Sequence, residues 1–170
     1  MKRKILIICA GVMVTFIMVL MCVGAMAVNP TDVSVSANVA ATITLDMPTT
    51  VVNFGAGPLA PGAVYNQAID ATVSSNKGWS LDVRKNQDLT GAVSLEVMPS
   101  SNLTFTSDSA NPRVTQKRTT ATEFPAADDY AVQGTRGGAI LSTISYSLDV
   151  PWELEPDTYT ATHTYTATQP

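Results

Sequence analysis

"TDVSVSANVAATITLDMP", residues 31–48, alternates apolar and polar side chains over most of its length. The apolar side chains fall on odd positions: Val33, Val35, Ala37, Val39, Ala41, Ile43 and Leu45. Successive side chains of a β-strand point to opposite faces, so this period predicts one long strand with an apolar face and a polar face. At about 3.3 Å per residue, a strand from Val33 to Leu45 would span about 43 Å, which is much longer than the typical strand of about five or six residues.

The same alternation recurs along the chain between short breaks of Pro, Gly and Asn. Further strands are predicted at 49–55, 64–75, 79–83, 92–99, 102–106, 139–151 and 158–168. The long connection 107–138 is weakly periodic, and we expect one or two edge strands within it, around 114–122. Short strands at this spacing predict an all-β sandwich of about eight or nine mostly antiparallel strands in one domain, residues 28–170.

The first 27 residues have the features of a secretory signal helix. Lys2, Arg3 and Lys4 precede an almost uninterrupted apolar run at 5–23, and the small residues of "AMA" follow at 25–27. We expect a signal peptide cleaved after Ala27, and hence a secreted or cell-surface protein. The alternative is an uncleaved anchor, in which case the leader would be the chain's contact with the membrane.

Both cysteines, Cys9 and Cys22, lie in this leader, so the expected mature chain has no disulfide and no thiolate metal site. Cleavage would remove three of the ten basic residues and none of the fourteen acidic ones, leaving a net charge of about −7 (seven minus fourteen). Phosphate binding needs clustered positive charge, so a nucleic-acid partner is not expected.

Several side chains alternate in phase and are expected in the core. They are Trp79, Leu81, Val83, Ile144, Tyr146, Leu148 and Tyr159. Tyr159 follows Pro156 by three residues and has the position of a corner tyrosine that bonds back to the backbone. In 92–99 the pattern places Val93, Leu95 and Val97 inward.

Two W-x-L motifs stand in this chain, "GWSLDV" at 78–83 and "PWELEPDTYTATHTYTATQP" at 151–170, with "VVNFG" upstream at 51–55. Together they resemble the WxL family of bacterial surface domains, and the last segment also resembles the late strands of bacterial Ig-like modules. The resemblance implies an Ig-like sandwich that attaches noncovalently to the cell wall. It departs from the family at the last strand, where Tyr165 and Ala167 stand in place of Trp and Leu, and Trp152 comes early.

For Trp152, a core position beside the corner proline is the favoured interpretation. The alternative is that Trp152 and Leu154 are contacts with the envelope or a partner.

The remaining polar residues give no catalytic constellation. His163 is the only histidine, and we interpret it as a half-exposed strand residue; the alternative is a base in a small hydrolase oriented by Asp128 or Asp129. These two aspartates, with Gly134, Gly137 and Gly138, are also the candidate calcium loop, although a solvated loop is the favoured interpretation. Asn102 begins a glycosylation acceptor motif. We expect no enzymatic activity, cofactor or metal.

The opening strand has two interpretations. In the first it is the first strand of the sandwich. In the second its early part, with Val33, Val35, Ala37 and Val39, leaves the domain and completes the sheet of a neighbouring copy, as strand addition does in fibres.

The leading functional hypothesis is a noncatalytic exported protein with a structural or adhesive role, whose partner is a cell-wall polymer or another surface protein. The alternative is a filament subunit that binds copies of itself through residues 31–45.

Overall fold

The computed structural model describes residues 34–170, and its compact folded unit comprises residues 39–170. The expected signal peptide, residues 1–27, and Val33 lie outside the described residues. The strands are β1 (Ile43–Asp46), β2 (Val64–Ser75), β3 (Trp79–Lys85), β4 (Thr90–Gly91), β5 (Leu103–Asp108), β6 (Val114–Lys117), β7 (Thr122–Glu123), β8 (Asp129–Gly134), β9 (Gly137–Asp149), β10 (Tyr159–Thr160) and β11 (His163–Thr168). One 3₁₀ turn, η1 (Ser100–Asn102), precedes β5, and no α-helix occurs in this part of the chain. All strand pairs are antiparallel, which confirms the all-β prediction.

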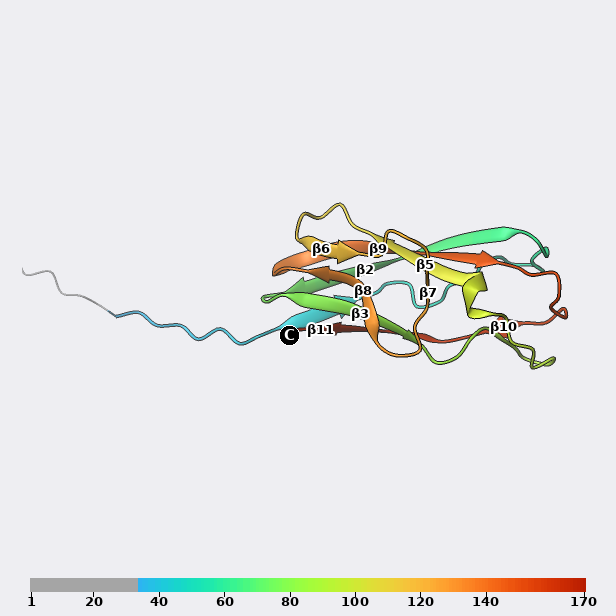
Figure 1. Ribbon diagram of the computed structural model, residues 1–170. Helices are drawn as coiled ribbons and strands as arrows, with labels where there is room; N and C mark the ends of the chain where they lie inside the picture. Colours follow the sequence, from blue (N-terminus) through green and yellow to red (C-terminus); the bar gives the residue numbers. More distant parts are fainter. Residues whose placement is uncertain (1–33) are drawn as a thin grey trace, which may run out of the picture. The chain divides into compact units, whose positions relative to one another are not determined.

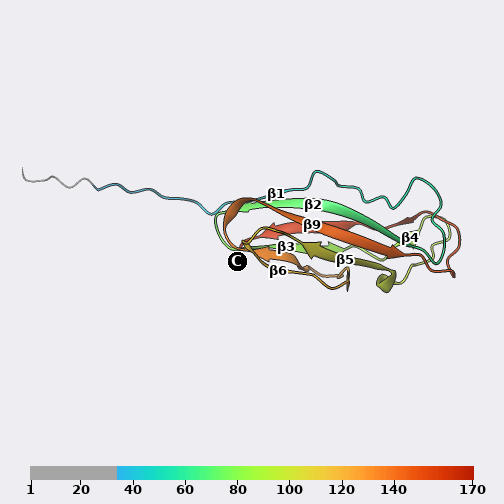
Figure 2. The same cartoon turned by 90° about the horizontal axis from the view of Figure 1, so that it is seen from above.

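Two sheets and one short ribbon make up the folded unit (Figure 1). The larger sheet has the order β1-β2-β9-β5-β7, the smaller sheet has the order β11-β3-β8-β6, and β10 pairs with β4. In Figure 2, β1 and β2 of the larger sheet lie on one side, and β3 and β6 of the smaller sheet lie on the other. The count exceeds the expected eight or nine because β4, β7 and β10 have only two residues each.

The paired strands β2 and β9 are the longest elements, with 12 and 13 residues. Both have the predicted alternation, and their registers place Ile69 opposite Ile144 and Val73 opposite Ile140. These four side chains are buried. β-Branched side chains pack well on a pleated surface, so sequence pattern and tertiary packing agree in this pair of strands.

The two sheets share one hydrophobic core. Its buried members are Ile69, Ala71, Val73, Trp79, Leu81, Val83, Met98, Leu103, Phe105, Phe124, Ala131, Val132, Ile140, Ile144, Tyr146 and Leu148. Six of the seven expected core residues are thus buried, and the seventh, Tyr159, is half-buried and packs against them. The indole of Trp79 donates to the carbonyl of Thr135 at 3.0 Å, so its one polar atom is satisfied inside the core.

The connection 107–138 contains three strands rather than one or two, because β6, β7 and β8 all form there. The chain passes from the smaller sheet to the larger one between β6 and β7, at Arg118. The amide of Ser107 donates to the Arg118 carbonyl at 2.7 Å, and the guanidinium lies 3.8 Å from the centre of the Tyr130 ring. This cation–π contact and a hydrogen bond from Arg118 Nε to the Tyr130 carbonyl fix the crossover.

Two predicted strands are wrong. Residues 49–55 form no strand, and Val51 is exposed. Residues 92–99 form a loop that folds back on itself, in which the Gly91 amide donates to the Glu96 carbonyl at 2.8 Å. Val93, Leu95 and Val97, which the pattern placed inward, are all exposed. The segment meets β4 only through one bridge, between Val97 and Thr90, because the chain closes a tight local turn before a longer ladder can form.

Candidate functional site

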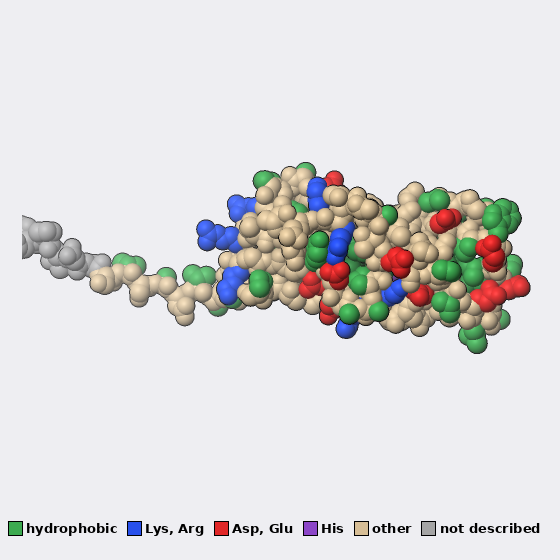
Figure 3. All heavy atoms as spheres, viewed as in Figure 1, with side chains coloured by type: hydrophobic (Ala, Val, Ile, Leu, Met, Phe, Trp, Pro, Cys, Tyr) green, Lys and Arg blue, Asp and Glu red, His purple; other side chains and the backbone are tan. Residues whose placement is uncertain are grey.

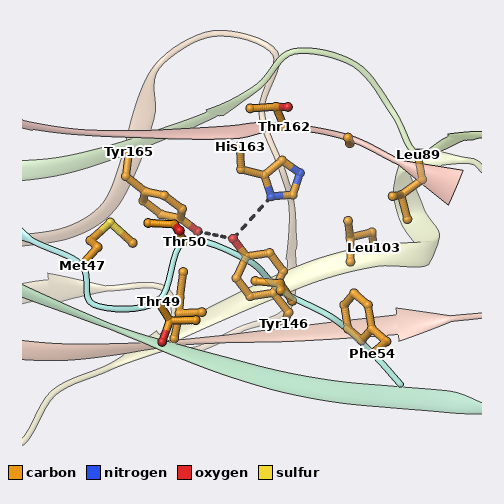
Figure 4. Close-up of a pocket in the computed structure, with 13 residues that line it drawn as sticks. Met47, Thr49, Thr50, Phe54, Leu89, Leu103, Tyr146, Thr162, His163 and Tyr165 are labelled. Atoms are coloured by element: carbon orange, nitrogen blue, oxygen red, sulfur yellow. Dashed lines mark hydrogen bonds between the residues drawn. The ribbon is translucent and has the colours of Figure 1, made fainter. Parts of the chain in front are cut away.

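A cavity of about 330 Å³ lies on the flank of the folded unit, between β2 of one sheet and β11 of the other (Figure 4). Its outer wall is the β1–β2 connection, residues 47–63, which contributes Met47, Thr49, Thr50, Val52 and Phe54. The remaining lining residues come from the strands and their loops: Ile69, Leu89, Leu103, Tyr146, Ala161, Thr162, His163 and Tyr165. We call it the β2–β11 cavity.

Three aromatic side chains form a hydrogen-bonded chain in this cavity. The hydroxyls of Tyr146 and Tyr165 are 2.8 Å apart, and His163 Nδ1 lies 3.4 Å from the Tyr146 hydroxyl. The imidazole also stacks on Phe124, with the ring centres 3.8 Å apart. His163 lies on β11 and is partly exposed, which is the position that the sequence interpretation gave it.

Burial decides the charge of these groups. It lowers the pKa of His163 to about 4, with a smaller contribution from the nearby Lys85 cation. It raises the pKa of Tyr146 to about 12 and also raises the pKa of Tyr165. All three side chains are uncharged at neutral pH, so together with the lining residues Thr49, Thr50 and Thr162 they give the cavity a neutral polar part beside its apolar part.

The aspartates considered with His163 have other partners. Asp128 lies 3.6 Å from Arg84, and Asp129 binds the guanidinium of Arg118 at 2.5 Å. Neither is a hydrogen-bond partner of His163 within the described part of the chain. No group of three or more His, Cys, Asp or Glu side chains in residues 34–170 has the geometry of a metal site, so the calcium alternative gains no support.

Next to the cavity, β2 has an open edge. The ladder between β1 and β2 ends at the pair Asp46 and Thr72, so residues Val64–Ala71 pair only with β9. Pro48 has no N–H to donate to a ladder, which explains why β1 stops there. Residues 47–59 continue beside β2 but form no backbone–backbone hydrogen bond with any described residue. Figure 2 shows this connection in cyan, running along the outside of β2.

The N-terminal part of the long predicted strand is not a strand in this structure. Only Ile43–Asp46 pairs, and residues 34–42 form no strand. The side chains of Val35 and Val39 are 90% and 79% exposed, and Ala37 is exposed as well. The first interpretation, in which the whole stretch is the first strand of the sandwich, is therefore wrong. The apolar face of residues 34–41 lacks a partner among the described residues.

A second exposed apolar surface lies at the end of the folded unit where β2 begins. Trp152 is 74% exposed, so the prediction that it belongs to the core is wrong; Leu154 is half-buried and packs against the core. The indole lies against the backbone of Gly62, where a Cβ atom would come within 2.6 Å of its Nε1. Gly62 also has a φ of +76°, so both the conformation and the contact favour glycine.

The neighbouring loop 92–97 is held in place by carboxylates. Asp157 accepts hydrogen bonds from the amides of Val93 and Ser94, each at 2.7 Å, and these bonds lower its pKa to about 2. Tyr159 donates its hydroxyl to the Glu155 carbonyl at 2.9 Å, which is the corner arrangement predicted for it. Leu95 adopts a φ of 58°, an unusual conformation for this residue type. The loop therefore holds the exposed side chains of Val93, Leu95 and Val97 in a fixed arrangement.

The two ends of the folded unit have opposite charge (Figure 3). At the end where β2 finishes and the chain enters the fold, three exposed cations gather: Lys77, Arg113 and Arg136. At the end with Trp152, the acidic residues are Glu96, Glu153, Glu155 and Asp157. The ends are therefore electrostatically complementary.

Asn102, the glycosylation candidate, donates its side-chain amide to the Asp149 carbonyl at 3.0 Å and is half-buried. Within residues 34–170, no helix has the length and apolar character that crossing a bilayer requires.

Comparison with protein-family models finds no match, and a search of curated proteins also finds none. The cavity and the open edge of β2 had not been predicted from the sequence. Pro48 was the available signal, because it interrupts the alternation just where pairing stops.

Proposed function

We propose that this chain is an exported, noncatalytic structural protein of the cell surface, an Ig-like β-sandwich that assembles into filaments through its N-terminal segment. The basic start, apolar run and small-residue motif of the leader support export. Strand addition supplies affinity through backbone hydrogen bonds and specificity through alternate side chains that fill pockets.

The observation that carries the proposal is the exposed alternation of residues 34–41. Val35 and Val39 present most of their surface to solvent, and the polar Ser36 and Asn38 alternate with them. A flat apolar strand face without a partner is an aggregation hazard that proteins usually protect. A segment with this pattern is instead suited to binding the edge of another sheet.

Electron microscopy of the purified exported protein tests the proposal. We expect filaments from the unaltered chain and single particles from a variant lacking residues 31–38. This deletion should spare the fold, because every core residue within the described range 34–170 lies at or beyond Ile43.

Two point variants distinguish the effect of disrupting the apolar face of residues 34–41 from the effect of adding a negative charge. Val35→Asp places a charge on the apolar face and should abolish filaments, whereas Ser36→Asp adds the same charge on the polar face and should preserve them. Filaments that survive the deletion, or that respond equally to both aspartates, would contradict the proposal.

Envelope association is a second candidate function, and the exposure of Trp152 favours it. Aromatic faces stack well on sugars and are common in interfaces. The test is sedimentation with isolated cell walls. Trp152→Ala should release the protein into the supernatant, while Leu141→Ala, which removes another half-exposed apolar side chain from β9, should not. Failure of the unaltered protein to sediment would remove this candidate.

A further inference from the structure

We propose that the open edge of β2, Val64–Ala71, accepts residues 33–39 of a second copy of this chain, which takes the place of the β1–β2 connection beside the β2–β11 cavity. This inference rests on the filament function proposed above and names its acceptor site. The two segments match in length, with eight residues on the acceptor edge and seven in the donor.

The acceptor edge is available because its present cover is weakly held. Residues 47–59 form no backbone ladder with β2, and they contact the core only through the half-buried side chains of Met47, Val52, Phe54 and Leu59. A strand in the same place would make the backbone hydrogen bonds that the connection lacks. The β1–β2 connection contributes side-chain packing alone, whereas a donor strand in its place would contribute both side-chain packing and a backbone ladder with β2.

The flank beside Ile69 has room for the apolar side chains of the donor. Gln67 is in phase with the buried Ile69 and Ala71, so its position faces the flank, yet its side chain is exposed. The inner layer is thus incomplete at this point, and the β2–β11 cavity lies beside it. Valine and alanine side chains at every second donor position would extend the apolar packing of Ile69 along this flank.

Chain geometry requires that the donor come from another copy. The chain enters the folded unit beside the end of β2, where Asn76 Nδ2 donates to the Ala40 carbonyl at 2.7 Å. The acceptor edge begins at Val64, about 40 Å away along a strand of 12 residues. In antiparallel pairing, donor residue 39 would lie near Val64. The three residues, 40–42, that link position 39 to β1 of the same copy cannot span that distance.

Charge complementarity favours the same arrangement. A donor that leaves one copy beside Lys77, Arg113 and Arg136 would bring this basic end to the acidic end of the next copy. The acidic end is where β2 begins, so the donor enters the acceptor at the correct end. Attraction between exposed charges is screened by salt, so assembly should slow as ionic strength rises.

Engineered cysteines test the acceptor site without interference, because both natural cysteines lie in the leader. One copy without residues 1–27 carries Gln67→Cys, and a second copy of different mass, also without residues 1–27, carries a single cysteine at one donor position. After mixing and mild oxidation, the mixed disulfide is measured. We expect it with Val35→Cys or Ala37→Cys, since these face the same side as Gln67, and at least tenfold less with Ser34→Cys or Ser36→Cys.

A matched acceptor control is Thr115→Cys on β6, the edge strand of the smaller sheet. Equal cross-linking to Thr115→Cys and Gln67→Cys, or equal cross-linking from both donor faces, would overturn the acceptor assignment. If filaments form while the cross-links go elsewhere, the acceptor site is wrong and the filament function stands. If the unaltered protein forms no filaments, both proposals fail.

Discussion

Residues 33–45 and β2 have the same alternation of apolar and polar side chains, yet they differ in structure. β2 pairs along its full length with β9 and buries Ile69, Ala71 and Val73. Within the described residues 34–46, only Ile43–Asp46 pairs with another strand, and Val35 and Val39 are exposed. The comparison teaches that alternation gives a segment the capacity to form a strand, while an available neighbouring edge decides whether the strand forms. The predictions below test this difference, beginning with the largest effect.

The first prediction compares burial in the two regions. Ile144 lies opposite Ile69 of β2 and is 0% exposed, so Ile144→Ala should lower the free energy of unfolding by about 2–5 kcal/mol. Val35→Ala should change it by less than about 0.5 kcal/mol, because that side chain is exposed. Urea unfolding of the monomer measures both. A comparable loss for Val35→Ala would show that residue 35 packs within its own copy.

The second prediction concerns the flank where the ladder is incomplete. The pKa of His163 is about 4 in the folded chain and about 6.5 in an unfolded one. Between these values the unfolded state binds more protons, so the free energy of unfolding should be constant above pH 6.5 and fall as the pH drops toward 4. Because the imidazole is partly exposed, we expect a loss of about 2 kcal/mol.

His163→Phe is the matched control for this pH dependence, because it keeps a ring beside Phe124 and removes the titration. The difference between the two unfolding profiles isolates the contribution of His163. Parallel profiles between pH 4 and 6.5 would contradict the assignment.

Much of the fold followed from the sequence. β2, β3, β5, β9 and β11 all lie where alternation predicted strands, because each has neighbours that cover its apolar face. Residues 34–42 and 92–99 have the same pattern and are not strands. The alternation of apolar and polar residues predicts which side chains can share a face, but it does not predict whether a neighbouring strand is available for pairing.

The candidate site was less predictable. The donor pattern of Val33, Val35, Ala37 and Val39 was visible in the sequence, and Val33 stays a prediction because it lies outside the described residues. The open edge of β2 was not visible, because it depends on where β1 stops and on how the β1–β2 connection passes over the flank. The contact between Trp152 and Gly62 was not visible either, because the two residues are far apart in the sequence.

The third prediction has the smallest effect and lies within the regular part of β9. Ser142 is buried between the layers, and its hydroxyl has no hydrogen-bond partner among the described residues. Ser142→Ala should leave the free energy of unfolding unchanged or raise it by up to about 1 kcal/mol, because it removes an unsatisfied polar group. Thermal unfolding measures the change. A clear loss of stability would mean that the hydroxyl has a partner after all.

The central claim is that the exposed opening segment binds the flank beside β2 in another copy. The most direct measurement adds a peptide of residues 31–41 to the variant lacking residues 31–38 and follows the His163 imidazole signal by NMR. The account predicts a saturable shift of that signal, and no shift with a control peptide in which Val33, Val35 and Val39 are replaced by aspartate. An unchanged signal at millimolar peptide, or an equal response to both peptides, would contradict it.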